Sequence, residues 1–360
     1  MTVAAFMELA LYDPEIGYYA RAAQRSGRAG DFVTSVDVGP VFGELLEVQL
    51  AEMAGLLTAG APATFTFDIV EAAAGNGRLS ADILRAARRR DPAFYERIRL
   101  HLVETSAVAR AQHVRVLGIE RERLVSSSPD LPGSFEGVLL ANELLDALPV
   151  HQVIMRPDGL REVYVQASGG SLRTIEGPPS TPELAAHLDR LGIIVEPGWR
   201  GEINLRAVEW IRAAARSLSR GFIIIIDYGH EARELYSVTH AGGTLTTFTR
   251  HTQAGPERPT DAPAWLEEAG DRDITAHVDF TSARMAAEAE GLTTLGFLDQ
   301  TYFLMGLGAA TLDTADLRRR LALKTLLMPG GLGSTHKVLI FGKGVGAPSL
   351  AGCSFRVRVT

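Results

Sequence analysis

The sequence contains very little cysteine and no long run of apolar residues. Cys353 is its only cysteine, so neither an intramolecular disulfide nor a multi-cysteine zinc site can form. No segment of 18 or more uninterrupted apolar residues occurs, and the N-terminus lacks a signal-peptide pattern. From these absences we expect a soluble protein without a membrane span, located in the cytoplasm.

The sequence also lacks a long basic stretch and several familiar catalytic motifs. The chain of 360 residues has a formal net charge of −7, which disfavours a general nucleic-acid-binding surface. Its nine histidines are scattered without the H-x-x-x-H pair of many zinc enzymes, and neither a G-x-S-x-G elbow nor a P-loop occurs. We therefore predict no nucleic-acid partner and no metal site.

What the sequence does contain is a short apolar strand pattern that leads into a glycine turn and a helix. Residues 65–72 are rich in β-forming residues and include the acid Glu71, and Gly75 and Gly77 follow at a spacing of two. Apolar residues then recur at helical spacing from Leu79 onwards. This order is typical of the first unit of a doubly wound α/β sheet, in which a ligand approaches the glycine backbone closely. An ordinary βα turn without a ligand is the alternative.

A second acid follows the next predicted strand. Residues 99–103 form an apolar strand pattern that ends at Glu104, which lies 27 residues after Gly77. At this edge of the sheet a carboxylate can accept both hydroxyls of an adenosine ribose. Glu104 is therefore predicted to bind a ribose, although an acid favoured by a helix N-terminus is the alternative.

Polar residues also follow the fourth predicted strand, residues 137–141. Asn142 and Glu143 come directly after it, and Asp146 lies three residues further on, which predicts that both carboxylates share one face of a short helical turn. Two close carboxylates suit a cationic substrate or proton transfer. The alternatives are that Asn142 caps the next helix, that Glu143 only contacts the donor, or that Asp146 holds the helix start.

We expect four parts along the chain. Residues 1–60 form a helical extension with a glycine loop, in which Gly30 and Asp31 are predicted to close over a ligand unless the loop is only a linker. Residues 61–149 form the Rossmann-like core, and residues 150–200 form an inserted β-containing lobe with a hairpin around residues 157–159. Residues 201–360 complete the core with additional helices.

Taken together, these stretches resemble the MidA-like methyltransferases, a family that includes the mitochondrial complex I assembly factor. The chain departs from the usual pattern at Val36–Asp37, where the family has Pro-Glu, at residues 72–74, where the turn has more glycine or proline, and at His336, where the family has Phe. The matching stretches are residues 6–19, 30–35, 42–44, 71–79, 141–149, 227–229, 243–245, 273–280 and 300–304.

The resemblance implies a class I methyltransferase fold and S-adenosylmethionine as the methyl donor. It further implies a protein arginine as acceptor, because the assembly factor of this family methylates one. Glu71, Gly75, Gly77, Glu104, Asn142, Gly30 and Asp31 are then the expected donor-binding residues. Glu143 and Asp146, with Asp279 next, are the expected ligands of the guanidinium group.

Two other functions stay open at this point. One is methyl transfer to an oxygen or nitrogen of a small molecule, with His251, His277 or Asp227 as a base. The other is a non-catalytic assembly protein that keeps the donor pocket. The acceptor can thus be a protein or a small molecule. The sequence does not decide between a monomer and a homodimer.

Overall fold

The structure is a computed structural model that describes residues 1–21, 34–59, 62, 64–249, 252–254, 262–312, 316–328 and 332–355. The predicted lid with Gly30 and Asp31 lies outside the described residues, as does His251.

A mostly parallel sheet forms the centre of the molecule. Its strand order is β14-β15-β9-β4-β1-β2-β3, and β13 adds a short pairing at the end of β9. Strands β3, β2, β1, β4 and β9 are parallel, whereas β15 pairs antiparallel to both β9 and β14. The strands are β1 (Phe67–Ala72), β2 (Ile98–Val103), β3 (Leu124–Ser128), β4 (Phe135–Asn142), β9 (Leu218–His230), β13 (Val278–Asp279), β14 (Thr293–Asp299) and β15 (His336–Lys343). The predicted doubly wound α/β fold is confirmed.

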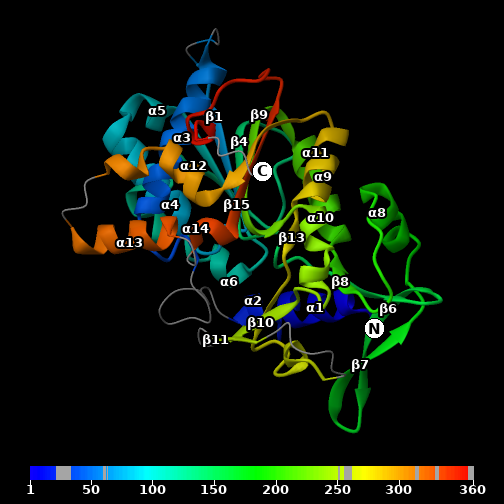
Figure 1. The fold of residues 1–360 in the computed structure, drawn as a ribbon. Helices are drawn as coiled ribbons and strands as arrows, with labels where there is room; N and C mark the ends of the chain where they lie inside the picture. Colours follow the sequence, from blue (N-terminus) through cyan, green and yellow to red (C-terminus); the bar gives the residue numbers. More distant parts are fainter. Residues whose placement is uncertain are drawn as a thin grey trace.

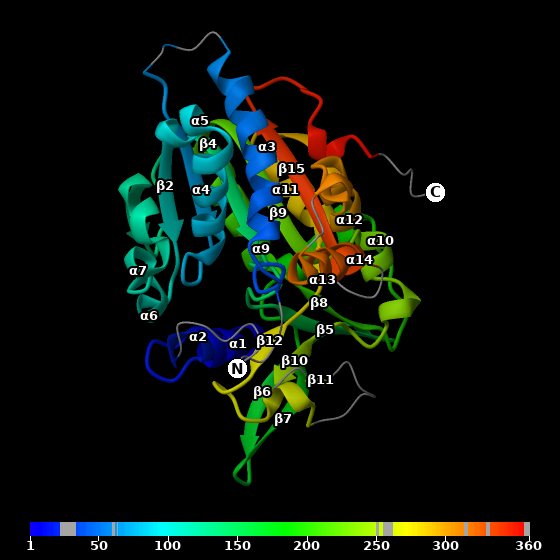
Figure 2. The same ribbon diagram turned by 90° about the vertical axis from the view of Figure 1, so that its left-hand side faces the viewer.

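Helices cover both faces of this sheet (Figure 1). One face packs against α3 (Val41–Thr58), α4 (Arg78–Arg90), α5 (Pro92–Arg97), α12 (Gln300–Gly306) and α13 (Leu317–Leu327), and Figure 2 shows α3 and α4 in front of the strands. The other face packs against α9 (Leu205–Ser217) and α11 (Phe280–Ala289). Shorter helices are α6 (Ala107–Arg110), α7 (His113–Leu117), η1 (Gly118–Arg123), α10 (Ala232–Leu235), η2 (Val238–His240), η3 (Ala264–Leu266), η4 (Ala309–Thr311), α14 (Leu332–Thr335) and η5 (Ala351–Cys353). Because both faces are covered, Phe222 to Ile226 of β9 are almost fully buried and apolar.

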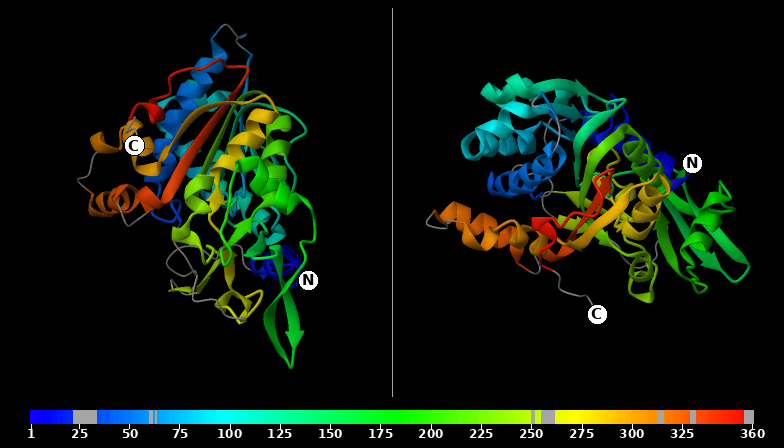
Figure 3. Two further views of the ribbon diagram at one scale, coloured as in Figure 1. Left: turned by 45° about the vertical axis from the view of Figure 1, so that its right-hand side comes forward. Right: turned by 90° about the horizontal axis from the view of Figure 1, so that it is seen from above.

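Two smaller sheets lie at one end of the central sheet, and the hairpin of β6 and β7 projects from the body (Figure 3). The first has the order β7-β6-β5-β8, and the second has the order β11-β10-β12. Helix α1 packs on them through Val3, Phe6 and Met7. The elements are α1 (Val3–Tyr12), α2 (Tyr18–Arg21), β5 (His151–Arg156), β6 (Gly159–Ser168), β7 (Ser171–Gly177), α8 (Glu183–Leu191), β8 (Arg200–Ile203), β10 (Thr246–Thr249), β11 (Thr252–Ala254) and β12 (Asp273–Thr275).

The structure confirms the hairpin around residues 157–159 and corrects one local expectation, because residues 143–146 are not helical. A second hairpin follows the first: Gly169 and Gly170 adopt positive φ and turn the chain back, so that β7 pairs with β6. The division of the chain at residues 60, 149 and 200 stays a prediction.

Candidate active site

A pocket of about 590 Å³ lies where the sheet changes direction, between the carboxyl ends of β1 and β4. Open α/β sheets bind ligands at this position, because the connections from the two strands leave in opposite directions. Five acidic and two basic side chains line it, which gives the pocket an excess of negative charge. Its wall is formed by Glu8, Tyr12, Tyr19, Thr34, Val36, Asp37, residues 71–76, Arg78, Leu79, residues 103–106, Ala109, Pro129, residues 142–144, residues 147–149, Arg206 and Trp210.

The glycine turn forms one side of this pocket. Ala73 and Gly75 line it and have positive φ values of 56° and 52°. Gly77 also has a positive φ, of 84°, and stands at the N-terminus of α4. A Cβ on Gly77 would lie 3.2 Å from Leu102 and 3.3 Å from His113, so this glycine packs against β2 and α7. Gly77 is not among the residues that line the pocket, and its place beside the donor stays a prediction.

Glu71 and Glu104 both reach the pocket wall at the ends of their strands. Glu104 accepts hydrogen bonds from the backbone N–H groups of Gly75 and Ser106, each at 2.8 Å, so its carboxylate also holds the turn. Glu71 accepts from the backbone N–H of Ser80 at 3.1 Å and from the Ser80 hydroxyl. Burial raises the pKa of Glu71 to about 7 and also raises the pKa of Glu104.

The segment after β4 brings Asn142 and Glu143 into the pocket. Glu143 has a φ of 50°, which is strained for a residue with a side chain. Its side chain lines the pocket just after the end of β4. Its Oε1 accepts from the backbone N–H of Ser35 at 3.2 Å and from the Asn142 amide at 3.3 Å. His336 Nε2 lies 3.6 Å from the same oxygen. The Asn142 Oδ1 atom is buried and accepts no hydrogen bond from any residue that the structure describes.

Asp146 lies outside the pocket wall, and Asp227 explains why. One carboxylate oxygen of Asp227 accepts from the backbone N–H groups of Leu144 at 3.1 Å and Leu145 at 2.8 Å. These bonds hold the segment in a bend instead of the predicted helical turn. Asp146 is buried, and burial, followed by the charges of Asp227 and Glu143, raises its pKa well above the ordinary value. We therefore correct the predicted pair of charged carboxylates, because only Glu143 faces the pocket.

Asp279 is not among the residues that line the pocket either. It caps α11, where its Oδ1 accepts from the backbone N–H groups of Thr281 at 3.0 Å and Ser282 at 3.1 Å. Its Oδ2 accepts from the Tyr236 hydroxyl at 3.3 Å. In the structure Asp279 therefore serves as the N-cap of α11, and its predicted contact with an acceptor stays a prediction.

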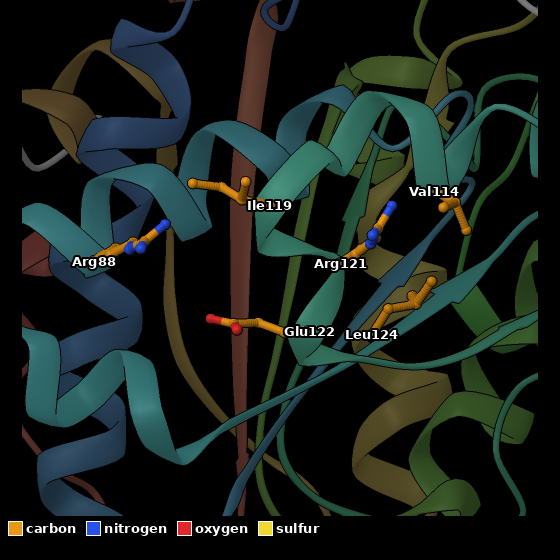
Figure 4. A pocket seen from close by; sticks show the side chains of 6 residues that line it. All are labelled: Arg88, Val114, Ile119, Arg121, Glu122 and Leu124. Atoms are coloured by element: carbon orange, nitrogen blue, oxygen red, sulfur yellow. The ribbon is translucent and has the colours of Figure 1, made fainter.

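A second hollow, of about 720 Å³, lies at the end of the strands that is opposite to the first pocket. Figure 4 shows the side chains that line it. It is lined by Arg88, Val114, Ile119, Arg121, Glu122 and Leu124. Leu124 begins β3 and Arg88 lies in the last turn of α4, so the hollow is at the amino ends of the strands. Its Glu122 already accepts from the Tyr95 hydroxyl at 2.7 Å. Ligands of open α/β sheets bind at the carboxyl ends of the strands, so this hollow is not where a site is expected.

Comparison with known proteins agrees with this geometry. Residues 45–298, more than two thirds of the chain, match the family described as "Putative S-adenosyl-L-methionine-dependent methyltransferase". The chain belongs to this methyltransferase family. The protein arginine methyltransferase NDUFAF7, mitochondrial, of Mus musculus is 29% identical over 379 residues, which cover 95% of the chain and 76% of that relative. The Homo sapiens protein of the same name is 28% identical over 351 residues, which cover 86% of the chain and 70% of the relative.

A solved structure supports the assignment to the methyltransferase family. It is described as a "likely methyl transferase" from Burkholderia thailandensis bound to S-adenosyl-homocysteine. It superposes with a TM-score of 0.85 at 29% identity and covers 98% of this chain and 90% of that chain. The methyltransferase therefore uses S-adenosylmethionine, whose demethylated product is bound in that relative.

The pocket of the methyltransferase fits this donor. Glu104 can accept the ribose hydroxyls through the lone pairs that its two backbone hydrogen bonds leave open. The Asn142 Oδ1 atom, which has no hydrogen-bond partner within the described ranges, can accept a hydrogen bond from the donor's amino group. The excess of acidic side chains suits a positively charged sulfonium. Donor-binding roles of Glu71, Gly75, Glu104 and Asn142 stay predictions that this arrangement supports.

The comparisons correct the expected location of the methyltransferase. We expected a cytoplasmic protein, but the relatives from mouse and human are named as mitochondrial proteins. The absence of a signal-peptide pattern was the basis of that expectation, and it does not bear on transport into mitochondria. No helix within the described ranges is long and apolar enough to cross a bilayer.

Sequence reasoning missed several residues that shape this site. His113 holds the glycine turn, since its Nε2 lies 2.9 Å from the Gly75 carbonyl oxygen and its Nδ1 lies 2.9 Å from the Ser127 hydroxyl. Asp37 pairs with Arg78 at 3.4 Å on the pocket wall. The only sequence signal for His336 was its departure from the family pattern. No periodicity or motif pointed to His113.

Proposed function

We propose that the methyltransferase transfers a methyl group to the guanidinium of an arginine in a protein. The names of the mouse and human relatives support this acceptor. The observation in this chain that carries the proposal is Glu143, a carboxylate held in a strained conformation on the wall of an acidic pocket.

The hydrogen bonds of Glu143 leave one side of its carboxylate available. Ser35 and Asn142 both donate to Oε1, and no described residue donates to Oε2. A guanidinium offers parallel N–H donors that match a carboxylate edge, and this pairing would fix the plane of the group. An ammonium group lacks that planar fork. The free oxygen therefore favours arginine over lysine as the acceptor.

Aromatic rings line the part of the pocket that an arginine side chain would cross. The rings of Tyr12 and Tyr19 lie 5.4 Å apart, and Trp210 belongs to the same pocket wall. The Tyr12 hydroxyl donates to the Ala147 carbonyl at 2.9 Å, and the Tyr19 hydroxyl donates to Asp273 at 2.9 Å. Burial raises the pKa of both phenols well above the ordinary value, so they keep their protons. Such rings can pack on an arginine stem and attract its charge.

Methyl transfer needs alignment more than covalent participation of the protein. S-adenosylmethionine supplies an electrophilic methyl group on its sulfonium. Proximity and orientation can lower a barrier by roughly 7–11 kcal/mol when the reacting atoms are held in line. In this proposal Glu143 holds two guanidinium N–H groups so that the third nitrogen faces the methyl. As that nitrogen forms its bond to the methyl carbon, the bond between sulfur and this carbon breaks, S-adenosylhomocysteine is the leaving group, and the methylated guanidinium releases one proton to solvent.

The test compares Glu143→Gln with the unchanged enzyme and with Asp279→Asn, a carboxylate-to-amide control outside the pocket. Each protein is incubated with labelled S-adenosylmethionine and a lysate of its own source, and modified residues are mapped by mass spectrometry. We expect label on protein arginine, loss of at least about 100-fold in rate for Glu143→Gln, and nearly unchanged donor affinity by calorimetry. The Asp279→Asn control should keep the activity.

Two outcomes would contradict the proposal. Label on a small metabolite, with none on protein arginine, would assign the enzyme to small-molecule methyl transfer. Normal arginine methylation by Glu143→Gln would keep the function and remove Glu143 from the acceptor site.

A further inference from the structure

Three histidines from separate segments meet outside the pocket. His230 ends β9, His240 ends η2, and His277 lies between β12 and β13. One ring nitrogen from each lies within 4.8 Å of the other two. The ring centroid of His230 lies 4.6 Å from the ring centroid of His240 and 5.2 Å from that of His277. Because the three positions are far apart in the sequence, no short spacing motif predicts this cluster.

Two of these imidazoles are oriented by hydrogen bonds to their Nδ1 atoms. His230 Nδ1 lies 3.0 Å from the Glu234 carboxylate, and His240 Nδ1 lies 3.0 Å from the Glu234 backbone carbonyl. Imidazoles that bind metal ions have this arrangement, in which the outer nitrogen donates to a carboxylate or carbonyl and the other nitrogen keeps a free lone pair. Because Glu234 accepts from the Nδ1 atoms of both His230 and His240, their Nε2 atoms keep a lone pair for a metal ion.

The third imidazole lacks the hydrogen bond that its burial would require. His277 Nδ1 is buried and has no partner among the described residues. Leaving such an atom unpaired costs free energy unless something else occupies it.

We propose that His230, His240 and His277 form a binding site for a divalent transition-metal ion of the zinc type. Three imidazoles with one position left for water is an established coordination of zinc. Bonds of 2.0–2.1 Å in a tetrahedron place the nitrogens about 3.4 Å apart, so the side chains need only move closer by rotation. All three side chains are half-buried, which leaves a path for the ion to enter.

Such an ion would connect segments that border the active site. His277 follows Ala276, whose backbone N–H donates to the Asp146 carbonyl at 3.0 Å, and its own N–H donates to the Thr244 hydroxyl at 3.1 Å. His230 lies three residues after Asp227, which holds the segment of Glu143. The ion would therefore hold together the end of β9 and the β12–β13 connection, which both contact the segment of Glu143 and Asp146. This role does not depend on which molecule accepts the methyl group.

The charged groups around the cluster are compatible with a cation. The Glu234 carboxylate faces His230, while the positive charge of Lys337 also acts on that ring. Lys337 is paired with Asp299, which offsets its charge. The net effect leaves one carboxylate, that of Glu234, to balance the ion.

The experiment uses the untagged full chain, because a histidine tag would bind the same metals. After treatment with a chelator, Co²⁺ is titrated and followed by its visible absorption, and Zn²⁺ is then used to compete. We expect one ion per chain, an intense tetrahedral Co²⁺ spectrum that Zn²⁺ removes, and a rise in Tm on addition of Zn²⁺.

Variants separate this site from adventitious binding. His240→Ala changes a half-buried side chain on a short surface helix, so we expect it to fold and to lose at least about 100-fold in affinity. His277→Ala should lose the spectrum, and Glu234→Gln should weaken binding by about 10–100-fold. His151→Gln removes an imidazole outside the cluster and should bind like the parent chain.

Absence of a Co²⁺ spectrum in the folded parent chain would overturn the proposal. Equal binding by the parent and by His240→Ala would show surface binding only and would overturn it too. Because the readouts are metal stoichiometry, spectrum and Tm, a failure of arginine methylation would not affect the result.

Discussion

Ala73 occupies a left-handed backbone conformation, with a φ of 56°, that glycine adopts more easily. Ala73→Gly should therefore stabilise the fold. The left-handed conformation costs a residue with a Cβ roughly 1–2 kcal/mol. The greater freedom of glycine in the unfolded chain offsets about 0.4–1 kcal/mol of this gain. We expect the free energy of unfolding to rise by about 0.5–1 kcal/mol.

The same turn supplies two matched variants. Gly75 has a φ of 52°, and a Cβ placed there would have no atom of a described residue within 4 Å, so Gly75→Ala measures the backbone cost alone. It should lower the free energy of unfolding by about 0.5–1 kcal/mol. Gly77→Ala should cost more, because its Cβ would also crowd Leu102 and His113. A Gly77→Val variant should lose stability for the same reason.

The assay is urea denaturation of the ligand-free chains, followed by circular dichroism under identical conditions. A free energy of unfolding that is unchanged or lower in Ala73→Gly, while Gly75→Ala shows its cost, would refute the strain argument at Ala73. Calorimetry with S-adenosylmethionine adds a second check. Loss of one methyl group from the pocket wall should change the donor binding free energy by no more than about 0.8 kcal/mol.

Three further predictions follow from the contacts of single side chains. Glu104→Ala should weaken S-adenosylmethionine binding by about 1.5–3 kcal/mol, as for a charge-assisted hydrogen bond, and unchanged affinity in calorimetry would remove Glu104 from the donor site. Asp279→Ala should lower the free energy of unfolding by about 0.5–2 kcal/mol through loss of the α11 cap while methyl transfer continues; a folded but inactive variant would contradict this assignment. Burial alone would lower the pKa of His336, but Glu143 and Asp227 outweigh it and hold that pKa above the ordinary value. Below this pKa a protonated His336 neutralises Glu143, so kcat/KM for a cationic acceptor should rise as pH increases through it, and His336→Phe should flatten the profile; equal profiles would exclude the pairing.

Local patterns predicted the central sheet well, because its strands combine buried apolar runs with turn residues at their ends. The ends of β1, β2 and β4 placed Glu71, Glu104, Asn142 and Glu143 correctly on one edge, since parallel strands share a direction. Periodicity and spacing were therefore enough to infer a doubly wound α/β sheet, whereas the class I methyltransferase fold was inferred from the family resemblance.

Long-range contacts explain what the sequence could not predict. Residues 143–146 have helical spacing, but Asp227, more than 80 residues away, takes their backbone N–H groups and prevents the helix. Asp279 was predicted as an acceptor ligand, but in the structure its carboxylate accepts from the backbone N–H groups at the start of α11. His230, His240 and His277 meet only because β9, η2 and the β12–β13 connection pack together. Such encounters leave no trace in a local pattern.

Strand β9 fixes the spacing between Asp227, which holds the segment of Glu143, and His230 of the histidine cluster. Asp227 and His230 lie three residues apart on one continuous strand, which pairs with β4 and β15 along most of its length and with β13 at its end. One inserted or deleted residue upstream of Asp227 would turn its carboxylate to the opposite face. Leu144 and Leu145 would then lose their acceptor, and Glu143 would lose its position. Differences in length among members of this family should therefore collect in surface connections, and this strand should keep its residue count even where its apolar side chains vary.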